Sequence, residues 1–163
     1  MTRRDAIVAS MAGLSALAMG TTAQAEESAK QNPEIEKIRS LLRAHDKAMT
    51  NHNLQGVMAC LTERAAIMGT GPGEIWVGPA EIKVAYEHFF EEFDKGQQKF
   101  DYHFKIGSMT SDMGWLMAAG NVTGKKDGKK LSFPLNISLT VTKSSGTWLI
   151  AAMHFSTLTG PGI

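Results

Sequence analysis

The chain has 163 residues, of which 43% are apolar and 20% charged, as expected for one ordinary globular domain. Its formal net charge is +1 at pH 7, and it lacks the clustered Lys and Arg that nucleic acid or an anionic membrane surface requires. Its basic run at residues 125–130 is split by Asp127 and Gly128, so we interpret it as a solvated hairpin tip. Because Cys60 is the single cysteine, no disulfide can form within one chain.

Residues 1–25 have the layout of a cleavable export signal. A basic start at Arg3-Arg4 precedes an apolar stretch at about residues 6–19, and Ala23-Gln24-Ala25 matches the A-x-A cleavage pattern. The stretch is too short, and too rich in small residues, to span a bilayer. The arginine pair resembles a twin-arginine signal, although Ala6 stands where an aromatic residue is usual; the Sec route is the alternative. We expect a periplasmic or secreted protein with no membrane span.

Helical spacing predicts the first part of the mature domain. Residues 26–32 are polar and predict a disordered lead-in. Pro33 suits the first turn of a helix, and Asn53 is a good cap for a second, short helix. Pro79 starts a third helix. The first helix carries one apolar stripe made of Ile35, Ile38, Leu42, His45 and Met49. The face of the third is made of Ile82, Tyr86, Phe89, Phe90 and Phe93.

Strand patterns dominate the rest of the chain. Two short strands at 65–68 and 75–77 flank a glycine-rich loop, and Asp127-Gly128 is a strong hairpin turn. Pro134 suggests an edge strand or a bulge. The longer strands are predicted at 99–109, 114–123, 130–142 and 147–157. Helices followed by an antiparallel meander favour the α+β class.

This order of elements resembles the SnoaL-like and ketosteroid-isomerase-like branch of the NTF2-like superfamily. The most specific segments are residues 74–78 with the helix start at 79–82, and Gly146-Thr147-Trp148 followed by His154-Phe155-Ser156. The resemblance places the domain at residues 33–158, with a tail at 159–163. It implies an NTF2-like (cystatin-like) cone, in which a curved antiparallel sheet wraps around N-terminal helices and encloses a pocket.

The resemblance also locates the positions where ketosteroid isomerases keep their chemistry. Gly69 stands at the position of the general-base Asp, His45 at that of the oxyanion-stabilising Tyr, and Ile137 at that of the protonated Asp. The usual proton transfer by that constellation is therefore not expected here.

Two histidines are the candidate acid/base groups. His45 lies on the apolar stripe and is predicted to face the interior, either as an acid/base or as a buried histidine bonded to a backbone carbonyl or a nearby Tyr. Alternation along the last strand puts His154 on one face with Trp148 and Ile150, and Phe155 on the other. By resemblance, Phe155 then lines the cone and His154 lies outside; a register shift of one residue would reverse this.

A pocket and a partner surface complete the expectations. Trp115 points outward on its strand, which suggests a homodimer through the outer sheet face. His45 and His52 lie seven residues apart without a carboxylate at ligand spacing, so no metal site is expected, and no cofactor is implied. The predicted pocket residues are Met49, Trp76, Tyr86, Phe90, Tyr102, Phe104, Ile137 and Phe155.

The sequence thus predicts an exported domain that binds a small, mostly apolar ligand in its pocket. One alternative is an enzyme of the isomerase, hydratase or cyclase kind that uses His45 with Tyr86, Tyr102 or His154. Another is a dimerisation module without catalysis. The presence of a cavity, and the identity of the histidine that reaches it, separate these possibilities.

Overall fold

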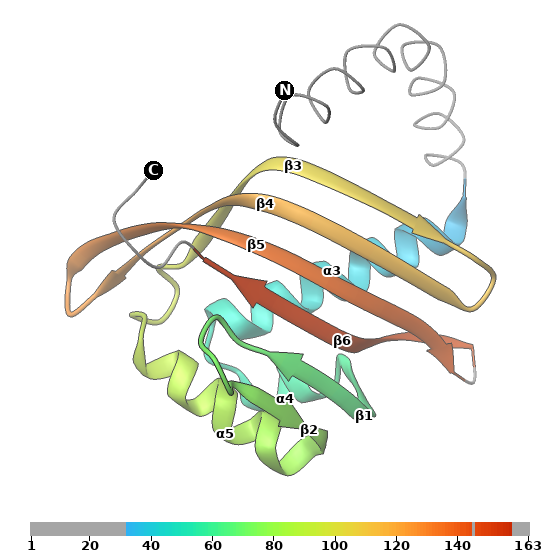
Figure 1. The fold of residues 1–163 in the computed structure, drawn as a ribbon, viewed down its shortest axis with the longest axis horizontal. Helices are drawn as coiled ribbons and strands as arrows, with labels where there is room; N and C mark the ends of the chain where they lie inside the picture. The colour runs from blue at the N-terminus through green and yellow to red at the C-terminus, as the bar shows by residue number, and fades with distance from the viewer. Residues whose placement is uncertain (1–31, 145, 158–163) are drawn as a thin grey trace, which may run out of the picture. The chain divides into compact units, whose positions relative to one another are not determined.

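The computed structural model describes residues 32–144 and 146–157. The predicted signal at 1–25, most of the lead-in and the tail at 159–163 lie outside the described residues. The chain divides into two compact units, Met1–Arg39 and Ser40–Ile163, and the second carries the candidate site. The elements in chain order are α3 (Pro33–Thr50), α4 (Leu54–Met58), β1 (Leu61–Met68), β2 (Ile75–Val77), α5 (Gly78–Glu91), β3 (Lys99–Met109), β4 (Met113–Lys126), β5 (Lys129–Ser144) and β6 (Thr147–Ser156) (Figure 1).

The three described helices begin at the residues that the sequence indicates. Pro33 opens α3, which buries His45 and Ala48. Asn53 caps α4, and its side-chain oxygen accepts a hydrogen bond from the backbone N–H of Gly56 at 3.0 Å. Pro79 stands in the first turn of α5, where its missing N–H costs nothing. None of the described helices is long and apolar enough to cross a membrane.

The six strands form one curved, unclosed sheet in the order β2-β1-β6-β5-β4-β3 (Figure 1). The predicted α+β class is confirmed, but the sheet is mixed, because β1 and β6 pair in parallel. The expectation of an all-antiparallel sheet was therefore wrong in this one pair. A parallel pair needs a long connection between its strands, and the chain from β2 to β5 supplies it. Helix α5 packs against β1 and β2.

Two β-bulges reverse the alternation of side chains along their strands. The β3–β4 register shifts between Tyr102 and Phe104, so these two residues point to opposite faces. The β5–β6 register shifts at Ala151, between the pairs Val141↔Ile150 and Thr140↔Ala152. Trp148 and Ile150 are therefore buried, at 4% and 0% exposure, on the inner side. Their predicted place beside His154 on the outer face was wrong, since one extra residue separates them from it.

Pro134 lies in a strand that is interior to the sheet, between β4 and β6. The last β5–β6 pair is Asn136↔Ser156, so Pro134 lies beyond it and that side of β5 is locally an edge. The hydroxyl of Thr157 donates to the Pro134 carbonyl there. The prediction that Pro134 lies in an edge strand was wrong, because β5 is interior to the sheet. At Pro134 itself, however, β5 has no partner strand on the β6 side.

Candidate functional site

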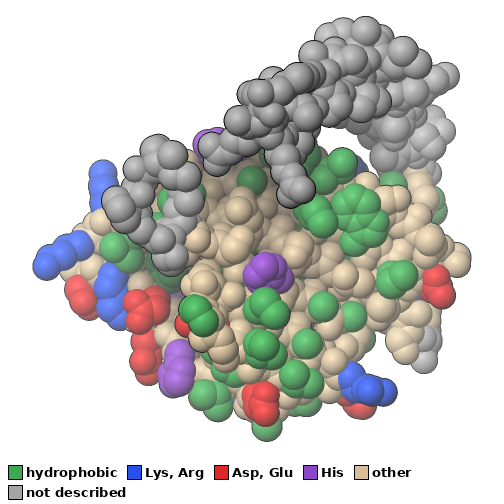
Figure 2. Space-filling view, viewed as in Figure 1, with side chains coloured by type: hydrophobic (Ala, Val, Ile, Leu, Met, Phe, Trp, Pro, Cys, Tyr) green, Lys and Arg blue, Asp and Glu red, His purple; other side chains and the backbone are tan. Residues whose placement is uncertain are grey.

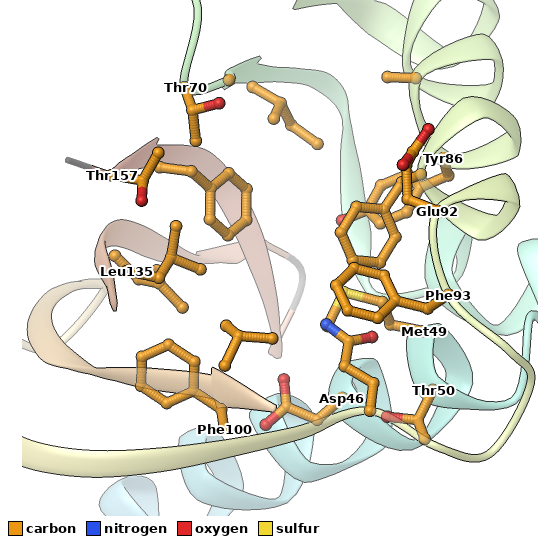
Figure 3. Close-up of a pocket in the computed structure, with 18 of the residues that line it drawn as sticks. Asp46, Met49, Thr50, Thr70, Tyr86, Glu92, Phe93, Phe100, Leu135 and Thr157 are labelled. Atoms are coloured by element: carbon orange, nitrogen blue, oxygen red, sulfur yellow. The ribbon is translucent and has the colours of Figure 1, made fainter. Parts of the chain in front are cut away.

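A large open cavity lies on the inner side of the sheet. Its volume is about 960 Å³, and residues from α3, α5, the β1–β2 loop and strands β3 to β6 line it (Figure 3). Its walls are mostly apolar because the stripes of α5 and the inner strand faces meet there. The larger apolar residues are Met49, Ile67, Trp76, Tyr86, Phe89, Phe93, Phe100, Tyr102, Val122, Leu131, Phe133, Leu135, Ile137 and Phe155.

His45 and Tyr86 form a buried polar pair behind one wall. His45 is 2% exposed, and its Nε2 lies 2.6 Å from the Tyr86 hydroxyl, which joins α3 to α5. Asp46 Oδ1 lies 3.6 Å from His45 Nδ1. The tautomer of His45 sets the direction of the hydrogen bond between Nε2 and the Tyr86 hydroxyl, which also lies 3.9 Å from Met153 Sδ. Burial raises the pKa of Tyr86, and Cys60 and Asp46 raise it further, so the hydroxyl stays protonated. Tyr86 lines the cavity, whereas His45 lies behind it and does not line the cavity.

Asp46 brings a carboxylate to the cavity that the sequence reasoning missed. Its side chain is 57% exposed and extends from α3 toward Phe100 (Figure 3). Burial, followed by the charge of Asp46, raises the pKa of Tyr102 to about 12, which reflects their proximity. The available signal was helical geometry: Asp46 lies about 100° around the helix from His45, at the border of the apolar stripe.

Glu74 brings a second carboxylate, from the loop between β1 and β2. Its Oε2 accepts a hydrogen bond from the backbone N–H of Gly71 at 2.7 Å. The ends of the loop are closed by the Gly69 N–H, which donates to the Glu74 carbonyl at 2.8 Å. Glu74 is therefore held in one turn while it lines the cavity.

The family model of the SnoaL-like domain matches residues 38–160, which is most of the chain. The chain belongs to the SnoaL-like domain family. No curated protein matches this sequence.

Solved structures show the same fold for this SnoaL-like domain. A ketosteroid isomerase-like protein from Erwinia carotovora atroseptica superposes with a TM-score of 0.64 at 22% identity, over 79% of this chain and 99% of that one. An NTF2-like protein of Pseudomonas putida gives 0.65 at 12% identity, over 77% and 87%. A cystatin-like-fold protein of Nostoc punctiforme gives 0.63 at 14% identity, over 76% and 90%. The predicted NTF2-like, cystatin-like fold is confirmed.

Gly69, which the resemblance aligned with the isomerase base, lies against the side chain of Glu74. A Cβ added at Gly69 would overlap Oε2 of Glu74 and lie 2.9 Å from its Cβ. A Cβ at Gly71 would lie 2.9 Å from the Glu74 carboxyl carbon. At Gly69 the contact includes the Glu74 Cβ, next to the backbone, so this glycine makes room for the Glu74 side chain. At Gly71 the added Cβ meets only the carboxyl end of Glu74, which would have to shift.

Six of the eight predicted pocket residues line the cavity, and two do not. Phe104 faces outward because the bulge at His103 turns it away, and it lines a smaller groove on the other face. Phe90 stacks on His52 instead, with ring centroids 4.8 Å apart. The six are Met49, Trp76, Tyr86, Tyr102, Ile137 and Phe155.

His154 lies exposed on the outer face, in a groove of about 330 Å³. The groove also contains Phe104, Met117 and Ser138. Figure 2 shows hydrophobic side chains gathered around a histidine on this face. The alternation argument thus placed His154 and Phe155 on the correct faces, and His154 is separated from the cavity by the sheet.

Among the described residues, no three His, Cys, Asp or Glu side chains come together in a way that could hold a metal ion. Cys60 is buried, and burial raises the pKa of its thiol, with a further contribution from Asp46. The thiol is therefore held in its unreactive, protonated form.

Proposed function

We propose that this SnoaL-like domain binds a small, largely apolar molecule in the cavity. The observation that carries the proposal is the open, apolar-walled volume of about 960 Å³, which is in the range of small-molecule sites. Tyr86, Asp46 and Glu74 add the few polar groups that such sites use to orient a ligand.

Binding of the neutral apolar dye Nile red tests the proposal by fluorescence. Ala85 lines the cavity from α5, while its neighbour Val84 is 45% exposed and does not line it. We expect Ala85→Phe, which places a ring in part of the volume, to weaken binding about tenfold or more and Val84→Phe to leave it unchanged. No binding by the folded wild-type protein, or equal binding by the two variants, would contradict the proposal.

Catalysis of the isomerase, hydratase or cyclase kind is the second candidate, and the 2.6 Å contact between His45 and Tyr86 favours it. Tyr86 is the member of the pair that lines the cavity. With the proton of His45 on Nε2 and donated to the Tyr86 oxygen, the Tyr86 O–H can donate to a substrate oxygen, while a cavity carboxylate such as Asp46 takes the proton from the α-carbon and returns it to the γ-carbon. Isomerisation of cyclohex-3-enone to its conjugated isomer, followed by absorbance, tests this. We expect Tyr86→Phe to lower the rate about 100-fold and Tyr102→Phe to lower it less. If the wild-type protein isomerises the substrate no faster than buffer alone, the catalytic proposal is contradicted.

A homodimer through the outer face is a proposal that the surface supports. Four large side chains on β3 and β4 are exposed there, namely Phe104 at 56%, Ile106 at 48%, Trp115 at 43% and Met117 at 54%. The described residues that line the groove beside them include no Asp, Glu, Lys or Arg, so a second copy meets no fixed charge in the groove. Native mass spectrometry should give a dimer, and Met117→Lys a monomer that still binds Nile red. If the domain were only a dimerisation module, it would dimerise without binding Nile red. A monomeric wild-type protein would contradict the homodimer proposal.

Export is also proposed, on the pattern of residues 1–25. Expression in a bacterial host followed by cell fractionation should place the protein outside the cytoplasm, with cleavage after Ala25. Replacement of Arg3 and Arg4 by Lys should block export by the twin-arginine route and leave the Sec route working. Cytoplasmic retention of the wild-type chain would contradict the proposal.

A further inference from the structure

We propose that the Glu74 carboxylate gives the cavity a preference for apolar ligands that carry a protonated amine. This inference rests on the proposed function, because it concerns a ligand held in the same cavity. It assigns to Glu74 a role beyond closing its own turn.

The loop around Glu74 is shaped to hold its carboxyl group at the cavity. Gly69 and Gly71 both lack the Cβ that would displace it, and the ring of Trp76 bounds the same space, 3.0 Å from an added Cβ at Gly69. The N–H of Gly71 donates to Oε2. A carboxylate has about four acceptor sites on its two oxygens, so acceptor capacity is left for a ligand donor.

The charges along the cavity favour a cation over an anion. Carboxylates line it at Asp46, Glu74 and Glu92, whereas ammonium groups line it only at Lys47 and Lys99 among the described residues. The ammonium of Lys99 is in an ion pair with Asp101. A protonated amine would therefore find an unbalanced negative charge, and its N–H would make a charge-assisted hydrogen bond with Glu74. A ligand carboxylate would meet repulsion.

Three naphthalene probes of similar size separate these effects: naphthylmethylammonium, naphthylmethanol and naphthoate. Each is titrated against bound Nile red at pH 7. We expect the ammonium probe to bind about tenfold more tightly than the alcohol, and the carboxylate probe to bind most weakly. In Glu74→Gln, which keeps a side-chain oxygen for the Gly71 N–H, the advantage of the ammonium probe should fall about threefold or more, with the alcohol unchanged.

Glu81 supplies the matched control. Its Oε2 accepts a hydrogen bond from the Val77 N–H at 2.7 Å, the same length as in the Glu74 turn, and Glu81 does not line the cavity. Glu81→Gln should change none of the three affinities. The inference is overturned if Glu74→Gln still binds the ammonium probe as much more tightly than the alcohol probe as the wild type does. It is also overturned if the wild type binds the two probes equally tightly. Dye and alcohol binding would remain in both cases, whereas the loss of all binding overturns the proposed function itself.

Discussion

The two faces of the sheet are built from the same strands and differ in what they do with similar residues. On the inner face, Phe100 and Phe155 line the open cavity of about 960 Å³. On the outer face, Phe104 and Met117 line a shallow groove and stay about half exposed. Aromatic side chains of similar chemistry therefore have different surroundings, according to the face of the sheet on which they lie. On β3 that side is set by one bulge.

The two histidines make the same point. His45 is buried and bonded to Tyr86, whereas His154 is exposed in the outer groove. A hydrogen bond to a histidine sealed in the interior is costly to break, because water cannot replace the lost partner. Substitutions on the two faces should therefore differ in size.

The largest difference is expected between Ile150 and Met117. Ile150 is fully buried on β6, so Ile150→Ala should lower the free energy of unfolding by about 2–5 kcal/mol through lost packing and a cavity. Met117 is 54% exposed, and Met117→Ala should cost about 0.5 kcal/mol or less in the monomer. Urea unfolding at low protein concentration measures both. Similar losses would show that the outer face is as well packed as the inner one.

Gly120 on β4 pairs with Tyr102, beside the β3 bulge, and a larger residue there should disturb the bulge. A Cβ there would overlap the backbone carbonyl of Asp101 and lie 3.0 Å from the ring of Phe100. Gly120→Ala should therefore lower the free energy of unfolding by about 1–3 kcal/mol and disturb the cavity wall at Tyr102, seen as weaker Nile red binding. Ala119→Ser, on the neighbouring residue, is the control and should change little. Unchanged stability in Gly120→Ala would mean that the bulge is not required.

The buried pair gives the next effect. Tyr86→Phe removes the hydroxyl and leaves Nε2 of His45 without this partner, so the free energy of unfolding should fall by about 1–3 kcal/mol. Tyr102→Phe is the matched control, since Tyr102 is 39% exposed and water can replace its contacts. Equal losses in the two variants, measured by urea unfolding, would show that the His45–Tyr86 contact adds no stability.

The smallest effect is expected at Asp94, after α5. Its carboxylate accepts hydrogen bonds from the backbone N–H groups of Gly128 and Asp127, which lower its pKa below the ordinary 3.8, as do Lys126 and Lys125. Because folding lowers the pKa of Asp94, its carboxylate stabilises the folded protein fully at pH values above the ordinary pKa. This stabilisation is lost as the pH falls through the lowered pKa of the folded state. Wild type and Asp94→Asn should thus differ slightly in melting temperature at pH 7 and converge in acid. A difference that is independent of pH would contradict this.

Much of the fold could be predicted because its signals are local. Pro33, Asn53 and the Asp127-Gly128 turn mark their elements correctly, since proline, caps and positive φ values act within a few residues. Strand β3 has the predicted bounds. For the site, the stripe on α5 correctly put Tyr86 at the cavity, but Phe90, one turn further along the same helix and offset by about 40°, stacks on His52.

The order of helices and strands and their turns could be derived from the sequence, because they follow from backbone preferences and spacing, and the family from its resemblance to known domains. Which residues meet depends on the tertiary structure. The parallel β1–β6 pair, the bulge that turns Phe104 outward, the bond between His45 and Tyr86 and the Glu74 carboxyl over Gly69 were all settled there. The physical reason is that register and bulges arise from pairing between distant segments, and a shift of one residue moves a side chain to the other face.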